Sequence, residues 1–319
     1  MFGFLNIHKP SGPTSHDIVA AARRRLGRGV KIGHAGTLDP FANGVLVLCV
    51  GHATRLADYV QAAVKCYRAQ VTLGAVSATD DPEGPITRST GILPVSPTGV
   101  SPVESDLRQG QDAPATHGRD AHATPDESAV RAALRQFTGT ISQVPPAHSA
   151  VHVDGQRAYK LARAGKSFDL KARSVHVYEM TMLSYDWPHL EIDVRCQAGT
   201  YIRSLARDIG AALGVGGYCS ALTRTAVGEF RLENAKSVDA VELPGDLISP
   251  LAAVEHLPKL TLDDEQVKRI NMGQPLRLAD NQFTTAKEVV LLAPDGGLLA
   301  LSEPTPDRLL KPRKVFVST

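Results

Sequence analysis

The chain has 319 residues, 43% of them hydrophobic and 21% charged, so it can form one or two globular domains with a sizeable core. Its formal net charge of +2 is too small to identify a nucleic-acid partner, so local clusters of basic residues have to decide that question. The longest apolar run, residues 45–50, is far too short to cross a membrane, and the first residues do not have the pattern of a secretion signal.

The four cysteines lie far apart along the chain, at Cys49, Cys66, Cys196 and Cys219. No two of them have the spacing of a zinc knuckle or of a redox pair, so the sequence predicts no metal site. An even number permits disulfides, but without a secretory context we expect the protein in the reducing cytoplasm.

The N-terminal part is predicted to alternate strands with one helix. Ser15 is the candidate N-cap of a helix over Asp17 to Leu26, which Gly27 ends. The segment through residue 7 is predicted to be a strand or a loop. Strands are predicted over the Val-rich run at 44–51 and over the alternating run at 67–74. Residues 33–43 are predicted to form a loop interrupted by Gly and Pro.

Residues 88–125 differ in composition from the rest of the chain. The stretch has five prolines, four glycines and no aromatic residue, and it contains two imperfect duplications. Such a segment buries too little apolar surface to offset the entropy of ordering it, which predicts a disordered surface insertion. An arm that contacts RNA or protein is the alternative, and the near-zero charge of the stretch argues against RNA.

The second half of the chain is predicted to resume with an amphipathic helix and to end in a small β-rich module. Helices are predicted at 126–137, 156–164 and 204–213, and paired strands at 175–185 and 190–197. A change of composition near residues 244–250 suggests a linker, so we expect domains at 1–250 and 251–319.

Basic side chains gather between residues 154 and 173. Arg157, Lys160 and Arg163 are spaced to share one helical face, and Lys166, Lys171 and Arg173 follow them. The cluster fits either phosphate binding, which would depend on salt, or a plain solvated helix face.

Asp39 lies in the loop Gly33-His34-Ala35-Gly36-Thr37-Leu38-Asp39-Pro40-Phe41-Ala42-Asn43-Gly44, directly before a proline and ahead of a buried strand. Glycine permits unusual backbone angles, and Pro40 restricts the residue before it, so this loop can hold a carboxylate rigidly at its tip. From spacing alone, an Asp that makes a local turn hydrogen bond is the slightly better explanation.

This loop resembles the signature loop of the TruB family of pseudouridine synthases, and three further motifs follow in the family's order. They are the Lys-Pro entry motif at residues 5–12, the Tyr-bearing strand from Lys65 to Gly74, and the Arg-bearing motif from Gly199 to Gly210. The resemblance covers most of residues 2–235. It implies an α/β (α+β) pseudouridine-synthase fold, in which helices flank a mixed, largely antiparallel sheet. It also implies a small PUA-like RNA-binding domain at the C-terminus.

The resemblance also implies the chemistry. The family breaks the C1′–N1 bond of a uridine in a folded tRNA, rotates the detached uracil and rejoins it through C5, which requires the base to be flipped out of its stack. No metal or organic cofactor is implied. Asp39 matches the nucleophile of the family. The first step that this carboxylate takes is attack on the sugar, attack on the base or abstraction of a proton, and the sequence does not decide among the three. Arg203 matches the arginine that pairs with the nucleophile, and Tyr67 the tyrosine that stacks on the uracil and serves as the final acid or base.

Further positions match residues that support the site or contact RNA. His34 matches the residue that fills the space of the flipped base, and the others are Lys9, Asp81, Tyr201, Leu222, Arg157 and Arg163. Each of these has a plainer alternative in packing, turn formation, a salt bridge or a solvated face. The chain departs from the family pattern at Ala78, His152, Gln156 and Thr223, and in the insertion at 88–125.

The expected substrate is the T-loop uridine at position 55, bound through the T-arm of tRNA by a monomeric enzyme without membrane contact. Two other functions fit the same motifs. One is a tRNA-folding chaperone whose catalysis is incidental. The other is a dyskerin-like subunit of a guide-RNA particle, against which the absence of a long lysine-rich tail argues.

Overall fold

The structure is a computed structural model, and it describes residues 2–27, 29–88, 124–149, 151–153, 155–278, 282–283 and 285–316. The chain divides into two compact units. Unit 1 combines residues 1–63 with residues 226–319, and unit 2 is the continuous stretch 64–225. The predicted boundary near residue 250 is not the boundary between these units, and a separate domain at 251–319 stays a prediction.

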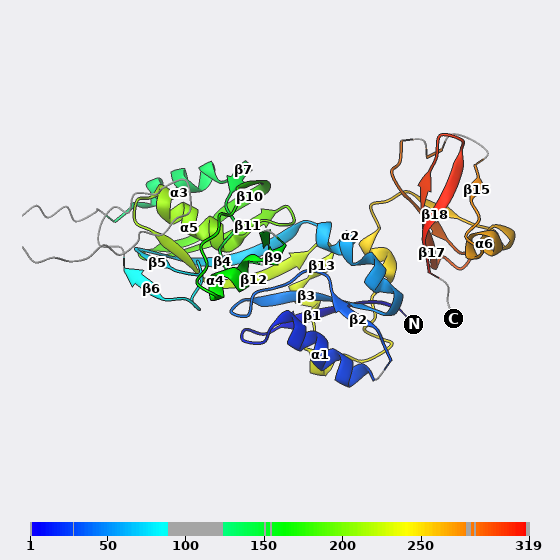
Figure 1. The fold of residues 1–319 in the computed structure, drawn as a ribbon, viewed down its shortest axis with the longest axis horizontal. Helices are drawn as coiled ribbons and strands as arrows, with labels where there is room; N and C mark the ends of the chain where they lie inside the picture. Colours follow the sequence, from blue (N-terminus) through cyan, green and yellow to red (C-terminus); the bar gives the residue numbers. More distant parts are fainter. Residues whose placement is uncertain are drawn as a thin grey trace, which may run out of the picture. The chain divides into compact units, whose positions relative to one another are not determined.

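The first part of unit 1 is built on the buried strand β3 (Asn43–Val50). It pairs antiparallel with β1 (Gly3–Lys9) and with β2 (Ile32–His34), and helix α1 (Ser15–Leu26) packs against this layer (Figure 1). The helix buries Ile18, Val19 and Ala22 against Leu5 and Ile7 of β1 and Leu46 and Leu48 of β3. The short helices η1 (Gly51–Leu56) and α2 (Ala57–Ala62) complete this part.

The N-cap of α1 is Thr14, so the prediction of Ser15 was wrong by one residue. Thr14 has an extended backbone, and its side chain accepts a hydrogen bond from the backbone N of Asp17 at 3.1 Å. The Asp17 carboxylate accepts one from the backbone N of Thr14 at 2.8 Å, which completes a capping box. Ser15 is therefore inside the helix, and its hydroxyl is available for a contact elsewhere.

The C-terminal part of unit 1 contains a second sheet, as the predicted β-rich module requires. Its strand order is β14-β16-β17-β18-β15, antiparallel except for the parallel pair β14–β16. The elements of this part are β13 (Phe230–Arg231), η2 (Leu232–Asn234), η3 (Val238–Ala240), η4 (Pro250–Ala253), β14 (Lys259–Thr261), α6 (Asp264–Asn271), β15 (Leu276–Arg277), β16 (Val289–Leu292), β17 (Leu298–Pro304) and β18 (Leu309–Val315). A contact with the first part runs through Phe316, whose ring stacks on that of Phe2 at 5.7 Å.

Unit 2 is a sheet of strand order β12-β4-β11-β10-β7 with helices on one face (Figure 1). The strands are β4 (Lys65–Leu73), β7 (Gly139–Gln143), β10 (Arg173–Asp186), β11 (His189–Cys196) and β12 (Gly217–Val227), whose last two residues already belong to unit 1. Helix α3 (Glu127–Gln136) contacts β10, and helix α5 (Ile202–Ala212) contacts β4 and α3. The pairs β4–β11, β11–β10 and β10–β7 are antiparallel, which confirms the predicted mixed α/β class with a largely antiparallel sheet.

Smaller elements of unit 2 are β5 (Ala75–Ser77), β6 (Ile86–Arg88), β8 (His152–Val153), β9 (Gln156–Arg157) and α4 (Ala158–Arg163). The helix predicted at 156–164 is shorter at its start, because Gln156 and Arg157 pair with β8 instead.

Residues 89–123, which carry most of the predicted insertion, lie outside the described residues. Within the part of the chain that the structure describes, no helix has the length and apolar content needed to cross a bilayer.

Candidate active site

The loop that carries Asp39 lies in unit 1 between β2 and β3. Gly36 and Gly44, on either side of Asp39, have φ angles of 117° and 110°, which L side chains rarely adopt. The backbone O of Asp39 accepts a hydrogen bond from the backbone N of Ala42 at 3.2 Å, so residues 39–42 form a tight turn. The sequence therefore predicted correctly that glycine-dependent turns enclose this aspartate.

Lys9, at the end of β1, binds backbone carbonyl groups of the same loop. Its side chain is fully buried, and Nζ donates to the backbone O of Pro10 at 2.8 Å, of Pro40 at 3.2 Å and of Ala42 at 2.7 Å. The backbone N of Gly12 also donates to Pro40 O at 2.8 Å. Two of the three carbonyls that Lys9 binds follow Asp39 closely in the loop, so this lysine fixes the C-terminal side of the loop within unit 1.

Ser15 is a second anchor of the loop, and the sequence did not identify it. Its buried hydroxyl donates to the backbone O of Leu38 at 3.0 Å and accepts from the backbone N of Leu38 at 2.9 Å. This pair of bonds fixes the residue immediately before Asp39. The backbone on the two sides of Asp39 is therefore held by α1 and β1 together.

His34 ends β2 and lies against a histidine of α1. The rings of His34 and His16 meet edge to face, with centroids 5.0 Å apart and an interplanar angle of 86°. His16 was not among the predicted site residues, although it stands next to Ser15 on α1.

Tyr67 and Leu222 lie in neighbouring strands of unit 2 and are both nearly buried. Tyr67 of β4 is 8% exposed, and its register partner in β11 is Val194. Lys65, two residues away and hence on the same face of β4, is 7% exposed. Burial, together with the smaller effect of the charge of Arg224 on β12, lowers the pKa of Lys65 to about 8. This sheet face therefore combines an aromatic ring with two basic groups.

Arg203, near the start of α5, forms a buried ion pair with Asp81. Its Nη1 lies 2.8 Å from Asp81 Oδ2, and the two side chains are 5% and 2% exposed. The guanidinium also donates to the backbone O of Thr79 at 3.2 Å and of His148 at 3.0 Å. Burial lowers the pKa of His148. Asp81, predicted only as a supporting position, thus fixes the predicted catalytic arginine within unit 2.

Tyr201, just before α5, is held by its backbone. Gln143 of β7 accepts from the backbone N of Tyr201 at 2.8 Å and donates to its O at 3.0 Å. The Arg173 guanidinium lies over the Tyr201 ring at 4.6 Å, within cation–π range.

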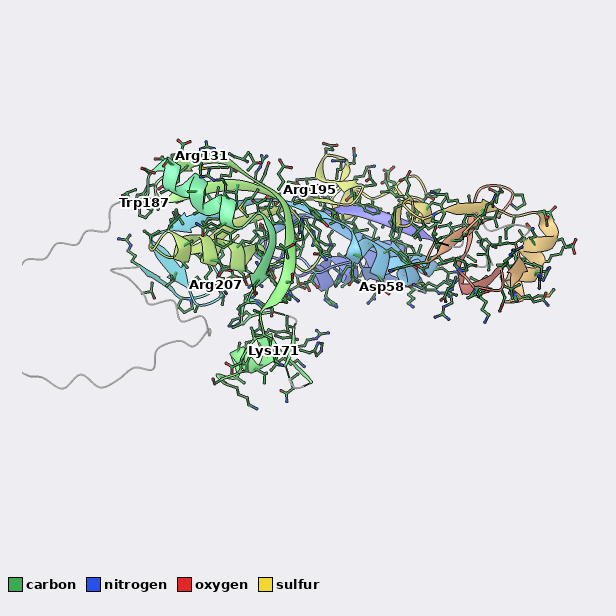
Figure 2. All side chains as sticks on the ribbon, turned by 90° about the horizontal axis from the view of Figure 1, so that it is seen from above. Asp58, Arg131, Lys171, Trp187, Arg195 and Arg207 are labelled. Carbon is green, nitrogen blue, oxygen red and sulfur yellow. The ribbon has the colours of Figure 1, made fainter. Side chains whose placement is uncertain are left out.

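The predicted RNA-contacting arginines lie on the exposed segment around α4. Arg157 and Arg163 are both exposed, and Arg163 lies 5.8 Å from the ring centre of Tyr159. Figure 2 shows this segment, marked by Lys171, standing away from the sheet of unit 2. Such a surface can meet a large polyanion without rearrangement of the sheet.

The predicted site residues divide between the two units. Lys9, His34 and Asp39 belong to unit 1 and the others to unit 2, so the pairing of Asp39 with Arg203 stays a prediction. No grouping of three His, Cys, Asp or Glu side chains that could hold a metal ion occurs among the described residues.

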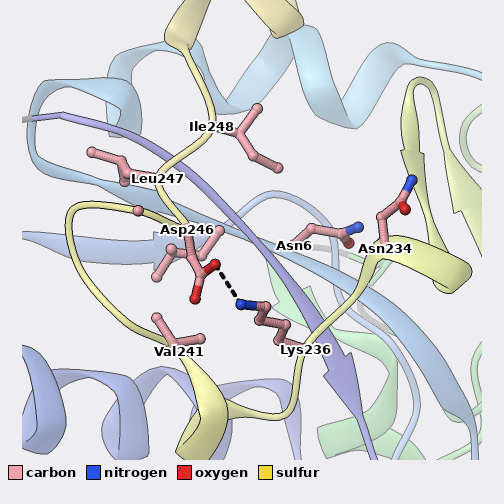
Figure 3. A pocket seen from close by; sticks show the side chains of 9 residues that line it. Asn6, Asn234, Lys236, Val241, Asp246, Leu247 and Ile248 are labelled. Carbon is pink, nitrogen blue, oxygen red and sulfur yellow. Dashed lines mark hydrogen bonds and ion pairs between the residues drawn. The ribbon is translucent and has the colours of Figure 1, made fainter.

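One pocket of unit 1 lies apart from all the predicted residues. It has a volume of about 260 Å³ and is lined by residues that include Asn6, Val241 and Leu247, with the ion pair of Lys236 and Asp246 at 2.6 Å beside it (Figure 3). The predicted chemistry does not draw on this pocket.

Comparison with family models gives two matches that together span most of the chain. Residues 23–109 and 103–202 match the model described as TruB family pseudouridylate synthase (N terminal domain). Residues 203–248 match the model described as tRNA pseudouridylate synthase B C-terminal domain. The two N-terminal segments meet within residues 89–123, where the sequence predicted an insertion.

Curated relatives match nearly the whole chain. The tRNA pseudouridine synthase B of Thermobifida fusca is 41% identical over 312 residues and covers 94% of both chains. That of Leifsonia xyli subsp. xyli is 41% identical over 306 residues, covering 94% of this chain and 92% of its own. That of Syntrophomonas wolfei subsp. wolfei is 36% identical and covers 99% of both chains.

Solved structures agree in fold. A Cbf5–Nop10–Gar1 complex matches 99% of this chain and 85% of its own chain, with a TM-score of 0.66 at 26% identity. An H/ACA RNP bound to a substrate RNA containing 2′-deoxyuridine gives the same TM-score at 25% identity, covering 99% of this chain and 86% of its own. The chain therefore belongs to the TruB family of tRNA pseudouridylate synthases, which makes it an isomerase.

Proposed function

We propose that this enzyme converts the uridine at position 55, in the T-loop of tRNA, to pseudouridine, with Asp39 as the nucleophile and the target base flipped out of its stack. The observation that carries the proposal is the support of the Asp39 loop. Lys9 and Ser15 fix the backbone on both sides of Asp39 through four hydrogen bonds in all. A carboxylate held in this way meets the requirement that a covalent catalyst be positioned before the substrate arrives.

The other residues take roles around this carboxylate. Arg203 keeps the Asp39 carboxylate ionised and oriented, since a neighbouring guanidinium favours the charged form of an acid. Tyr67 stacks on the flipped uracil and serves as the acid or base of the last step. His34 occupies the space that the flipped base leaves, while Tyr201 and Leu222 line the uracil pocket.

Recognition of the T-arm is assigned to the exposed basic segment that includes Arg157 and Arg163. Each phosphate that these side chains neutralise releases counterions, so the affinity for tRNA falls as salt rises. In this proposal the enzyme works in the cytoplasm as a monomer, without a membrane, a metal ion or an organic cofactor.

The test is the conversion of a plain, unmodified tRNA transcript by purified protein without added metal. Wild-type protein forms one pseudouridine, at position 55, and Asp39→Asn forms none because the amide cannot act as a nucleophile. The matched control is Asp58→Asn, an exposed aspartate of unit 1, which leaves turnover within about twofold of wild type. Turnover by Asp39→Asn at the wild-type rate would refute the proposal, as would modification at another position.

The same assay separates this proposal from the guide-RNA function. Two of the structural neighbours are described as complexes with other proteins or RNA, and for this reason the guide-RNA function is tested as the alternative. Activity of the purified chain on tRNA alone excludes a need for such partners. Binding and folding of tRNA by Asp39→Asn, measured in parallel, report whether the protein also assists tRNA folding.

A further inference from the structure

Two consecutive aspartates of unit 2 bind two arginines that stand one helical turn apart. Asp81 pairs with Arg203 at 2.8 Å, and Asp80 pairs with Arg207 at 2.9 Å. Because Arg203 and Arg207 are four residues apart in α5, they lie on the same face of the helix. The loop after β5 is therefore attached to α5 by two parallel ion pairs, and only the first involves a residue with a proposed role in the reaction.

The backbone of Asp80 makes this double attachment possible. Side chains of consecutive residues in an extended chain point to opposite sides, yet both carboxylates here reach the same helix face. Asp80 has a φ of 60°, a left-handed conformation that Asp tolerates better than most residues. Its backbone is fixed by a hydrogen bond from Asp80 N to Ser77 O and another from Cys219 N to Asp80 O, both at 3.1 Å.

Arg207 connects this loop to a second one. Its Nη1 binds Asp80, its Nε donates to Asp208 Oδ1 at 2.9 Å, and its Nη2 donates to the backbone O of Val144 at 3.0 Å. Ser204 Oγ also donates to Val144 O, at 2.9 Å. The segment that begins at Val144 leads to His148, whose backbone O accepts from Arg203. Arg207 therefore ties together both loops that contact the Arg203 guanidinium, and Figure 2 labels it in this unit.

We propose that Arg207 and Asp80 are positioning residues of the isomerisation, which act through Asp81 and the segment 144–148 to fix the guanidinium of Arg203. Neither residue touches the substrate. The inference rests on the proposed function, in which Arg203 supports the carboxylate of Asp39. It predicts that loss of the Asp80–Arg207 pair slows the chemical step and leaves tRNA binding nearly unchanged.

The charge state of Asp80 provides a second measurable consequence. The pKa of Asp80 is raised to about 6, chiefly because the carboxyl is buried and to a smaller extent because of the charge of Asp208, while Arg207 and Arg203 oppose the rise. These three residues of α5 are the charged groups that act on Asp80. At neutral pH the Asp80–Arg207 ion pair is present, and below about pH 6 Asp80 takes up a proton and Arg207 loses its charged partner.

The experiment measures kcat and KM for a plain tRNA transcript with Arg207→Met, Asp80→Asn and the double variant. Asp80→Asn retains volume, and Asn tolerates a positive φ, so this variant preserves the backbone. At pH 7.5 we expect each single variant to lose between about tenfold and a hundredfold in kcat, the size of a small misplacement of catalytic groups, with KM within about twofold. The double variant should be no slower than the slower single variant, because both remove the same ion pair.

The matched control is Arg131→Met, which breaks the ion pair of Arg131 with Glu127 on α3 at 2.7 Å. That pair is 53% and 60% exposed, and we expect its loss to change kcat by less than about twofold.

The pH profile separates positioning from general stability. The kcat of wild type should fall towards that of Asp80→Asn as the pH drops through about 6, and the profile of Asp80→Asn should lack this fall. Single variants within twofold of wild type, multiplied losses in the double variant, or parallel pH profiles would each overturn the inference. Turnover by Asp39→Asn would overturn the proposed function instead, so the two failures can be told apart.

Discussion

Lys65 is a nearly buried cation on the same sheet face as Tyr67. Burial lowers the pKa of its ammonium group to about 8, below the ordinary value of 10.5, and the charge of Arg224 adds to the effect. When the folded pKa of a lysine lies below the unfolded value, the charged form destabilises the folded state. This penalty is fully present below the folded pKa, and it disappears as the pH rises from about 8 towards 10.5.

We therefore expect the free energy of unfolding of wild type, relative to Lys65→Met, to rise by roughly 2 kcal/mol between pH 7.5 and 9.5. Urea unfolding of both proteins at the two pH values measures this difference. Lys171→Met, at an exposed position, controls for the general effect of losing a lysine. An identical pH dependence for wild type and Lys65→Met would contradict the burial argument.

Single residues also differ in how far the sequence identifies them. Asp39 could be selected as a candidate from the sequence because its motif is local, with two glycines and a proline within a few positions. The partners that fix the site were not, since Asp81 and Arg203 are separated by 122 residues, and Ser15 and Leu38 by 23. One sequence contains no information on which distant groups meet, and Ser15 in particular has the appearance of an ordinary N-cap.

At the level of elements, α5 packs so closely on the chain before β12 that only glycine fits at the contact. A Cβ on Gly210 would overlap the backbone of Gly216 and Gly217, and the carbonyl of Gly210 accepts hydrogen bonds from Val215 and Gly216. This helix carries Arg203 and Arg207, so its close approach to the sheet sets where both guanidinium groups lie.

Gly210→Ala should therefore lower the free energy of unfolding by at least about 2 kcal/mol, and turnover should fall with it, because backbone cannot move aside as a flexible side chain can. Chemical unfolding followed by circular dichroism measures the loss. Ala212→Ser, on an exposed position of the same helix, should change stability by less than about 0.5 kcal/mol. Equal stability of Gly210→Ala and wild type would show that the contact is looser than described.

The elements for which the sequence predicted definite bounds lie within a few residues of them, because their hydrophobic periodicity reflects which face is buried. Helix α3 and strands β3, β10 and β11 follow their predicted ranges closely. Helix α4 is the instructive exception, because the pairing of His152 with Arg157 removes two residues from the predicted helix. Strand pairing depends on a partner segment, which a helical period calculated along one segment does not include.

For the whole molecule, the prediction that residues 88–125 are dispensable is independent of the site. Their composition offers too little apolar surface to stabilise a core. Replacing residues 89–123 by a short Gly/Ser linker should leave kcat/KM within about twofold of wild type. Arg157→Gln combined with Arg163→Gln provides the contrast, since it should weaken tRNA binding and its salt dependence. A large loss on deletion would assign the insertion a role in the reaction.

The division into units was not predictable, because no change of composition marks residues 63 or 225. The change that the sequence does show, near residues 244–250, lies inside unit 1. Contacts between distant segments, such as those of Phe2 with Phe316 and of Arg55 with Val315, make one unit of the two ends of the chain.

This arrangement has a consequence for synthesis on the ribosome. Unit 2 is one continuous stretch, so it can fold as soon as it has emerged, whereas residues 1–63 must wait for the part of unit 1 that follows residue 225. At about 5–20 residues per second, translation of unit 2 alone keeps the nascent β1 and β3 without that partner for roughly ten to thirty seconds. During this interval their apolar side chains are available to chaperones, and the half of the enzyme that carries Asp39 is the last to be completed.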